Sequence, residues 1–300
     1  MLALAGALWL VLALLLTECP AAAATVQVPQ VVRESRFDIA NPAEVAEVVQ
    51  QVVSFPPGAW TSPHSHGGQA VNLVMDGEIT FRRGDTEQKY AAGQAWSDPT
   101  GDVHAAGNDS GAHASLLTNF LLPAGAAQTI VRGESPLQPQ VTYESRHPVS
   151  SLPANAGVIQ QAADFEPGAS TGTIKHGGQA VHIVVFGEIT YRADGQERVY
   201  RAGGAWQDPA GHAYAASNAG SDTARLFTTI LLPEGIELTE PATTEGAAPA
   251  PVQPTQDTAG GLAAILPAAA AALLLLLGVG FWLARRARTA VTKGGPGEES

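Results

Sequence analysis

Three histidines in the first half of the chain have the residue type and spacing of metal ligands. His64 and His66 are separated by one residue, and His104 follows further along the chain. Side chains at positions i and i+2 of a β-strand point to the same face, so His64 and His66 can converge on one ion. His104, on a distant strand, would complete the set. Neutral imidazoles suit divalent transition metals, so we expect Fe, Zn, Mn, Ni or Cu.

Three protein ligands leave coordination positions open for water or a small molecule, as in catalytic rather than structural metal sites. The sequence therefore predicts a divalent metal at His64, His66 and His104, with a small-molecule ligand beside it. The competing interpretation is a pocket whose three histidines bind no metal. No general base can be assigned from the sequence, so no catalytic residue is named.

Short strands separated by turns must position these histidines. Val71–Met75 is an apolar, β-rich run, Asp76-Gly77 is a hairpin signal, and Glu78–Arg82 continues as the next strand. Ala114–Leu122 is a further apolar strand, and glycine and proline residues punctuate the segments between. Many short strands with such turns are typical of an all-β sandwich or barrel.

The chain contains a duplicated domain. Phe55–Gly125 matches Phe165–Gly235 without a gap, at an offset of 110 residues and with about half of the positions identical. A repeat of this length is a domain rather than a solenoid unit. We therefore expect two tandem barrels, over residues 25–130 and 131–239, which could pair within the chain.

The first copy resembles the cupin superfamily in two motifs. The first motif combines a glycine, two histidines one residue apart, a glutamate and a closing glycine, and it is matched by Gly58, His64, His66 and Gly77. The second motif is matched at every defined position, by Gly93, Pro99, Gly101, His104 and Asn108. The second copy keeps Gly168, His176, Gly187, Gly203, Pro209, Gly211 and Asn218. The resemblance covers roughly residues 27–238 and implies two jelly-roll β-barrels.

The copies also depart from the family pattern. The glutamate of the first motif falls on Ala70 and, in the second copy, on Ala180. Gln69 and Gln179 stand one position earlier, where strand alternation would send them to the opposite face unless a bulge intervened. Both are candidates for hydrogen bonding in a pocket, with packing in a turn as the alternative. Without the glutamate, a bound metal would keep its full charge and favour a chelating anionic ligand.

The second copy has lost the metal-binding pattern, because Ile174 and Tyr214 replace its first and last histidines. It adds His182 at the position that Asn72 holds in the first copy. One interpretation is a site of two histidines and a tyrosine, and the other is a structural or metal-free barrel. The possible pocket residues of both copies are Gln69, Asn72, His176, His182 and Tyr214. The repeated Trp96 and Trp206 are expected in the cores, with a stacking platform as the alternative.

Both ends of the chain have the composition of targeting segments. Residues 1–24 are apolar and end in small residues, which predicts a secretory signal peptide, cleaved or kept as an anchor. Residues 261–284 carry no charge and precede Arg285 and Arg286, which predicts a transmembrane helix and a cytoplasmic tail at 285–300. Residues 240–260, rich in Pro, Thr and Ala, indicate a stalk. We therefore expect a single-pass protein of a bacterial cell membrane, with an extracellular ectodomain.

Charge and cysteine content narrow the possible partners. The formal net charge is −12, from 28 acidic and 16 basic residues, which argues against nucleic acid as a partner. The single cysteine, Cys19, lies in the predicted signal peptide. The mature ectodomain would therefore have neither disulfides nor cysteine metal ligands.

Two functions are compatible with these features. The first is a cell-surface double cupin that binds a divalent metal and a small ligand in its N-terminal barrel, as a non-catalytic binding or sensing module. The alternative is a metal-dependent dioxygenase or related metalloenzyme that acts on a small anionic substrate outside the cell. The missing glutamate and the degenerate second site favour the binding module, whereas the intact second motif favours an enzyme.

Overall fold

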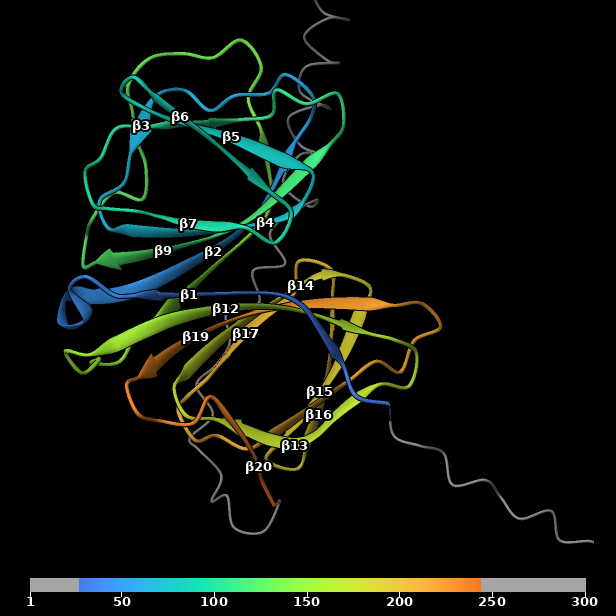
Figure 1. The fold of residues 1–300 in the computed structure, drawn as a ribbon. Coiled ribbons are helices and arrows are strands. Elements are labelled where there is room, and N and C mark those ends of the chain that lie inside the picture. Colours follow the sequence, from blue (N-terminus) through green and yellow to red (C-terminus); the bar gives the residue numbers. More distant parts are fainter. Residues whose placement is uncertain (1–26, 244–300) are drawn as a thin grey trace, which may run out of the picture. The chain divides into compact units, whose positions relative to one another are not determined.

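The described part of the chain is all-β, as the sequence predicted. The computed structural model describes residues 27–243, in which a short 3-10 turn, η1 (Pro42–Glu44), is the only helical element. The strands form two barrels of the jelly-roll type, one for each copy of the repeat (Figure 1). The predicted signal peptide, transmembrane helix and tail, and most of the stalk, lie outside these residues. Within them, no helix has the length and apolar character needed to cross a membrane.

Barrel 1 is built around the first histidine motif. Its strands, in chain order, are β2 (Val45–Phe55), β3 (His64–Ser65), β4 (Gln69–Asp76), β5 (Glu78–Arg83), β6 (Thr86–Ala91), β7 (Ala95–Asp98), β8 (Ala105–Gly107), β9 (Ala114–Pro123) and β10 (Ile130–Val131). A five-stranded sheet has the order β11-β2-β9-β4-β7, where β11 is Gln140–Pro148. The remaining strands pair as β6-β5-β8 and β10-β3.

Barrel 2 repeats this arrangement with two five-stranded sheets. Its strands are β12 (Ala156–Phe165), β13 (Ser170–His176), β14 (Gln179–Phe186), β15 (Glu188–Ala193), β16 (Gln196–Arg201), β17 (Ala205–Asp208), β18 (Tyr214–Ser217), β19 (Ala224–Pro233) and β20 (Thr239–Pro241). The sheet orders are β1-β12-β19-β14-β17, where β1 is Gln30–Asp38, and β16-β15-β18-β13-β20.

The first strand of each copy pairs with the other copy. β1 runs antiparallel to β12, with Ser35 opposite Gln160. β11, which stands 110 residues after β1, runs antiparallel to β2, with Ser145 opposite Gln50. The two copies therefore exchange equivalent edge strands, and each large sheet contains residues from both halves of the chain.

Strand alternation along β4 divides its side chains between two apolar environments. Val74 faces the interior of barrel 1, where it packs in a cluster with residues that include Phe55 and Ile79. Leu73 points to the opposite face and packs in a cluster that contains residues of barrel 2: Ala162, Ile183 and Phe227. Because both faces of the strand are covered, β4 is a nearly continuous apolar run rather than an alternating one.

Buried amides add polar contacts between the barrels. Gln50 Nε2 donates to the carbonyl oxygen of Val181 at 3.3 Å. Gln160, the repeat partner of Gln50, donates through Nε2 to the carbonyl oxygen of Val71 at 3.2 Å. The same contact is thus made once in each direction, as in an interface with two-fold symmetry.

The hairpin between β4 and β5 requires a glycine. Gly77 has a φ of 73°, in the left-handed region, which glycine adopts without steric penalty. A Cβ at this position would also lie only 2.6 Å from the carbonyl oxygen of His113. These two restrictions explain the glycine that closes the first motif.

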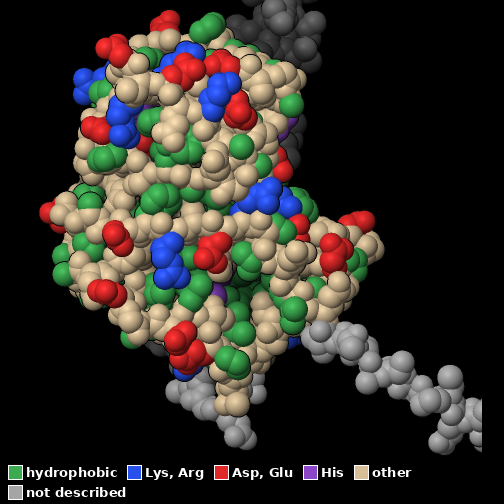
Figure 2. Space-filling view, viewed as in Figure 1, with side chains coloured by type: hydrophobic (Ala, Val, Ile, Leu, Met, Phe, Trp, Pro, Cys, Tyr) green, Lys and Arg blue, Asp and Glu red, His purple; other side chains and the backbone are tan. Residues whose placement is uncertain are grey.

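Charged side chains are dispersed over the surface in view. On the face shown in Figure 2, acidic and basic side chains are interspersed, without a patch of one sign. Several ion pairs link exposed side chains of adjacent strands, such as Arg82 with Glu87 and Arg192 with Glu197. Exposed pairs of this kind typically contribute about 0–1 kcal/mol each, so the stability of the fold depends mainly on apolar burial.

We expect Leu73→Ala to destabilise the protein by about 2–5 kcal/mol, because it opens a cavity in a fully buried cluster. Urea unfolding followed by tryptophan fluorescence would measure the change. Leu137→Ala is the matched control, since Leu137 is 46% exposed, and it should change stability by no more than about 0.5 kcal/mol. Equal effects of the two substitutions would contradict the packing described here.

Candidate metal centre

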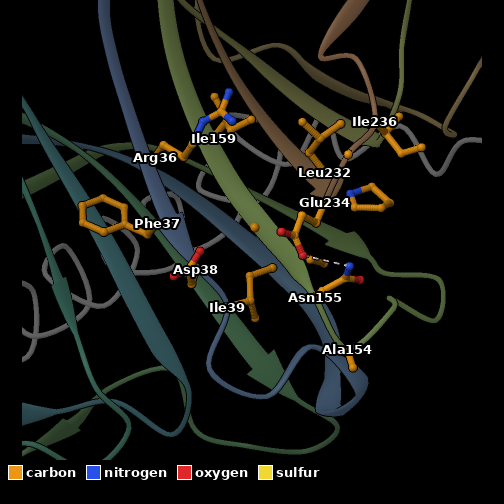
Figure 3. A pocket seen from close by; sticks show the side chains of 14 residues that line it. Arg36, Phe37, Asp38, Ile39, Ala154, Asn155, Ile159, Leu232, Glu234 and Ile236 are labelled. Atoms are coloured by element: carbon orange, nitrogen blue, oxygen red, sulfur yellow. Dashed lines mark hydrogen bonds between the residues drawn. The ribbon is translucent and has the colours of Figure 1, made fainter.

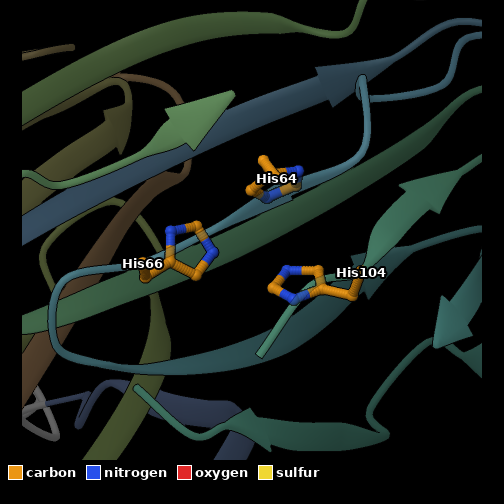
Figure 4. Close-up of side chains that lie close together, drawn as sticks. All are labelled: His64, His66 and His104. Carbon is orange, nitrogen blue, oxygen red and sulfur yellow. The ribbon is translucent and has the colours of Figure 1, made fainter. Parts of the chain in front are cut away.

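Backbone pairing brings the three predicted ligands together. His64 and His104 form an isolated antiparallel bridge in which each backbone N–H donates to the carbonyl oxygen of the other residue at 2.9 Å. His66 follows directly after β3. One ring nitrogen of each histidine lies within 4.8 Å of the other two, and the ring centroids are 4.5–5.1 Å apart. Figure 4 shows the three rings grouped around one space.

Hydrogen bonds to the backbone determine which nitrogen of each of the three rings carries the proton. The acceptors are the carbonyl oxygens of Ser62, Gln128 and Asp102, at 2.8, 2.9 and 3.1 Å from Nδ1 of His64, His66 and His104, respectively. Because a carbonyl oxygen can only accept, each Nδ1 carries a proton and each Nε2 of a neutral ring presents a lone pair. Histidines that bind metals are usually held in this way. The three residues therefore fit a divalent cation.

Burial keeps these imidazoles neutral. Desolvation, which disfavours the charged ring, lowers the pKa of His64 and lowers the pKa of His66 to about 4. For His104, desolvation and the neighbouring His64 and His66 lower the pKa to about 3. Neutral rings are the form that binds metal, so at neutral pH the site needs no proton release from these side chains.

A buried carboxylate lies beside the three histidines. Asp98 is 2% exposed and accepts hydrogen bonds from Asn72 Nδ2 at 2.8 Å, Trp96 Nε1 at 3.2 Å and Arg83 at 3.2 Å. Its Oδ2 lies 3.6 Å from His104 Nε2. Burial is the main cause that raises the pKa of Asp98 to about 6, against the opposing effects of its donors.

Asp98 is the site residue that the sequence analysis missed. It belongs to the segment AWSDP, which recurs as AWQDP in the second copy, and this recurrence is the signal that could have drawn attention to it. In the β4–β7 register, Asp98 lies opposite Ala70, the position where the family pattern has its glutamate. A carboxylate is therefore present next to the expected location, on the neighbouring strand.

The histidines line a cavity of about 310 Å³ inside barrel 1. Asn72, Trp96 and Asp98 also line this cavity. The other walls are largely apolar and include Val53, Phe55, Leu116, Phe120, Val131 and Val141. A cavity with a few converging polar groups and apolar walls is the usual form of a small-molecule site.

Two further predicted residues of barrel 1 are placed differently. Asn72 lines the cavity, as proposed from the sequence. Gln69 does not: its Nε2 donates to the Asp38 carbonyl oxygen at 3.0 Å and to Ser97 Oγ at 2.9 Å. Because side chains alternate along a strand, Gln69 and Asn72 point to opposite faces of β4. The register of β4 with β7 has no bulge that would change this orientation. Gln69 therefore lies outside the histidine cavity, and its hydrogen bond to Asp38 holds the end of β1.

The predicted pocket residues His176, His182 and Tyr214 of barrel 2 lie together, and their side chains contact one another. His176 Nε2 lies 2.7 Å from the hydroxyl oxygen of Tyr214, and the rings of His176 and His182 are 6.0 Å apart. His182 stacks on Trp206, with ring centroids 4.7 Å apart. Ile174 occupies the position of the first histidine and packs against the same cluster. Among the described residues, the histidine cluster of barrel 1 is the one with metal-binding geometry.

A buried aspartate also lies in barrel 2, with different partners. Asp208 Oδ1 lies 2.7 Å from His212 Nδ1, and Oδ2 lies 3.2 Å from His182 Nε2. Burial alone would raise the pKa of Asp208, but these two histidines lower it well below its usual range. In return, the hydrogen bond that His212 donates to Asp208 raises the pKa of His212 to about 9. The carboxylate is thus neutralised by the protein itself.

The two tryptophans also belong to the barrel interiors. Trp96 is 6% exposed and stacks on Tyr90 with a centroid distance of 4.5 Å. Trp206 stacks on Tyr200 in the same way, at 4.4 Å. Each indole Nε1 also donates to the aspartate two residues later. Both rings therefore have an aromatic partner on one face and a hydrogen-bond acceptor for their N–H group.

A larger hollow of about 450 Å³ lies at the ends of β1, β12 and β19 (Figure 3). Its lining includes Arg36, Asp38 and Glu234, and Asn155 Nδ2 donates to Glu234 Oε2 at 3.2 Å. The lining contains no histidine, and its charges do not converge on a single point as the imidazoles of barrel 1 do. We assign it no chemistry.

Comparison with known families identifies the domain type. Residues 51–120 and 162–230 match the family described as Cupin domain. These stretches run from β2 to β9 and from β12 to β19, one in each barrel, so the comparison supports a tandem cupin. A comparison with curated proteins gave no match.

Several solved structures are similar at low identity. Oxalate decarboxylase from Bacillus subtilis at pH 4.6 is 13% identical over 69% of this chain and 74% of that chain, with a TM-score of 0.46. A second structure of that protein, described by its Mn(II) centres, is 13% identical over 72% and 80%, with a TM-score of 0.44. AerE from Microcystis aeruginosa is 13% identical over 69% and 98%, with a TM-score of 0.44.

We expect the metal-free protein to lose stability as the pH falls from about 6.5 to about 4. The pKa of His66 is about 4 in the folded state and about 6.5 in an unfolded chain, so the unfolded state binds more protons in this window. Chemical unfolding at a series of pH values, with a chelator present, measures the slope. His66→Gln should reduce the loss, whereas His113→Gln, at an exposed position, should not. Equal slopes for wild type and His66→Gln would contradict this expectation.

Proposed function

We propose that this protein is a cell-surface double cupin whose N-terminal barrel binds one divalent metal ion through His64, His66 and His104, and a small ligand beside it. The role is binding or sensing rather than catalysis. The observation that carries the proposal is the common anchoring of the three imidazoles: each Nδ1 is bonded to a backbone carbonyl, and the three rings surround one space.

The metal and the barrel wall have separate tasks in this proposal. When bound, a divalent cation supplies a Lewis acid and a positive charge for a polar or anionic ligand. The apolar walls, which include Phe55 and Phe120, exclude water and strengthen that attraction. Asn72 lines the same cavity, but its Nδ2 is engaged by Asp98 and its Oδ1 accepts from Thr118 Oγ1. It therefore shapes the cavity more than it contacts a ligand.

The ionisable groups of the cavity favour binding over catalysis. Among the described residues of its lining, Asp98 is the only ionisable side chain apart from the three histidines. A general base must be within hydrogen-bonding reach of the proton it accepts, but the carboxylate of Asp98 already accepts from three protein donors. No other residue of the lining can serve as an independent base.

A metalloenzyme is the second candidate, favoured by the space in front of the ligands. Three ligands leave coordination positions open, and these would face a cavity of about 310 Å³. In this case the protein is a cupin-type dioxygenase or related enzyme with a small anionic substrate. Oxygen consumption with panels of small carboxylates, in the metal-loaded full chain, distinguishes the two: turnover that His104→Ala abolishes identifies the enzyme.

Barrel 2 has a structural role in this proposal. Its interior is occupied by contacts among His176, His182 and Tyr214, and it remains paired with barrel 1 through the exchanged strands β1 and β11. The pair is tethered to the membrane by residues 261–284, through a stalk at 240–260, with a signal peptide at 1–24 directing both barrels outside the cell.

Elemental analysis of the full chain, purified in detergent and supplied with divalent metals, tests the metal site. We expect about one metal ion per chain in the wild type and none after His66→Ala, because one of three ligands is lost. His176→Ala, the repeat partner of that substitution, should keep the metal. A folded, metal-supplied wild type without metal would contradict the proposal, as would equal loss in the two variants.

The cellular location is tested with an epitope tag placed after Ser300. In intact cells, added protease should degrade the barrels and leave a short, protected fragment that carries the tag. Lysed cells provide the control, in which the tag should also be lost. Barrels that resist protease in intact cells but not in lysates would contradict a surface location.

A further inference from the structure

The cavity of barrel 1 reaches the surface along a row of aliphatic side chains. Leu116 lies opposite Val53 in the β2–β9 register, and Val53 lies opposite Val141 in the β11–β2 register. Directly opposite residues of antiparallel strands point to the same face of a sheet, and all three residues line the cavity. Their exposed fractions rise from 4% for Leu116 through 8% for Val53 to 51% for Val141. This aliphatic row therefore runs from the buried interior to solvent, over two strand spacings or about 9–10 Å.

A second exposed valine of the cavity lies beside the histidines. β10 pairs with β3 so that Val131 is opposite His64. The two side chains therefore share a face, and Val131 lines the cavity although 61% of it is exposed. Single exposed apolar side chains are ordinary on a protein surface, but Val131 and Val141 line the same cavity. We call these two valines the aliphatic rim, because they mark where the cavity meets solvent.

The segment that joins the two copies of the repeat carries the aliphatic rim. Residues 129–141 pass along barrel 1 and include β10 and the start of β11. The backbone N–H of Arg132 donates to the carbonyl oxygen of Pro63 at 2.7 Å. Gln138 Nε2 donates to Ser62 Oγ at 2.8 Å. These hydrogen bonds hold the segment against the residues that precede β3, so the rim has a fixed place beside the metal ligands.

Several polar side chains of the cavity are engaged by the protein itself. Gln51 Nε2 donates to Glu144 Oε2 at 2.6 Å, and Thr61 Oγ1 accepts from the backbone N–H of Ala106 at 2.9 Å. The described lining also contains no lysine or arginine. A second charge on a ligand would therefore lose its hydration without gaining a protein cation, which is costly. The cavity favours a ligand with one charged end, at the histidines, and an apolar remainder.

We propose that the ligand of barrel 1 is amphiphilic, with a compact chelating anion at the three histidines and an aliphatic chain along the aliphatic row to the rim. The inference rests on the proposed function, since it assumes a metal at the histidines. The chain replaces water on Leu116, Val53 and Val141, which line one continuous wall. The ligand class is thus a short-chain acyl compound with a single ionised head group, rather than a dicarboxylate or a sugar.

Hydroxamates of increasing chain length test the ligand class on the full chain, loaded with Co²⁺ in detergent. The hydroxamate group chelates divalent metals, so its binding is followed by the visible absorption of the bound Co²⁺, with the free probe measured by equilibrium dialysis. We expect affinity to rise from acetohydroxamate through butanohydroxamate to hexanohydroxamate by about fourfold per methylene, because each buried methylene contributes about 0.8 kcal/mol. The analogue of butanohydroxamate with a terminal carboxylate should bind more weakly than butanohydroxamate.

The double variant Val131→Thr, Val141→Thr tests the path of the chain. Each substitution exchanges a methyl group for a hydroxyl group at an exposed position, so the metal content should stay that of the wild type. We expect the double variant to weaken hexanohydroxamate by about 10-fold and acetohydroxamate by no more than about twofold. Val31→Thr is the matched control, because Val31 is the repeat partner of Val141 in barrel 2 and is also exposed. It should change neither affinity.

The outcomes separate this inference from the proposed function. Equal affinity for the three hydroxamates would overturn the inference and leave the metal site intact. An unchanged dependence on chain length in the double variant, or equal weakening by Val31→Thr, would overturn it as well. A chain that binds Co²⁺ but none of the probes would overturn both the inference and the ligand site of the proposed function, and a chain that binds no metal would overturn the whole proposal. If the double variant does not fold, the two single variants are measured against the same control.

Discussion

The interior of each barrel imposes one constraint on its ionisable residues: burial disfavours the charged form of a group unless another group compensates it. An uncompensated buried charge costs several kcal/mol. Barrel 2 satisfies the constraint within the protein, by placing His182 and His212 against Asp208. Barrel 1 instead gathers three neutral imidazoles and one carboxylate around a cavity. This contrast explains why Asp208 has its compensating groups within the protein, whereas the histidines of barrel 1 are suited to a cation.

The metal centre also depends on the connection between the two halves of the chain. Nδ1 of His66 donates to the carbonyl oxygen of Gln128, which lies between β9 and β10. The side chain of Gln128 is held in turn by Arg146, a residue of the exchanged strand β11. Arg146 also pairs with Glu47 on β2. The surroundings of a candidate ligand in barrel 1 thus include Arg146, a residue of the second copy, and the two copies cannot be considered independently.

Local features of the sequence were sufficient to predict the β-barrels and the histidine cluster. The ungapped repeat, the turn residues and the i, i+2 spacing of His64 and His66 report local geometry. Asp98 was missed because its proximity to Ala70 arises across a strand pair, which spacing along the chain does not reveal. Chain order likewise assigned β1 to the first barrel, although it pairs with β12. β2 and β12 are equivalent strands of the repeat, so no local feature shows which of them β1 joins.

The exchange of edge strands within one polypeptide has a consequence for how the two sites can evolve. In a symmetric dimer of identical chains, a substitution in one site appears in both, so losing a ligand in one copy removes it from the other. Here the two halves occupy equivalent places but are encoded separately, and His64 of one is Ile174 of the other. Duplication with exchange therefore keeps the shared interface of a dimer while allowing one half to lose the histidine set that the other half retains.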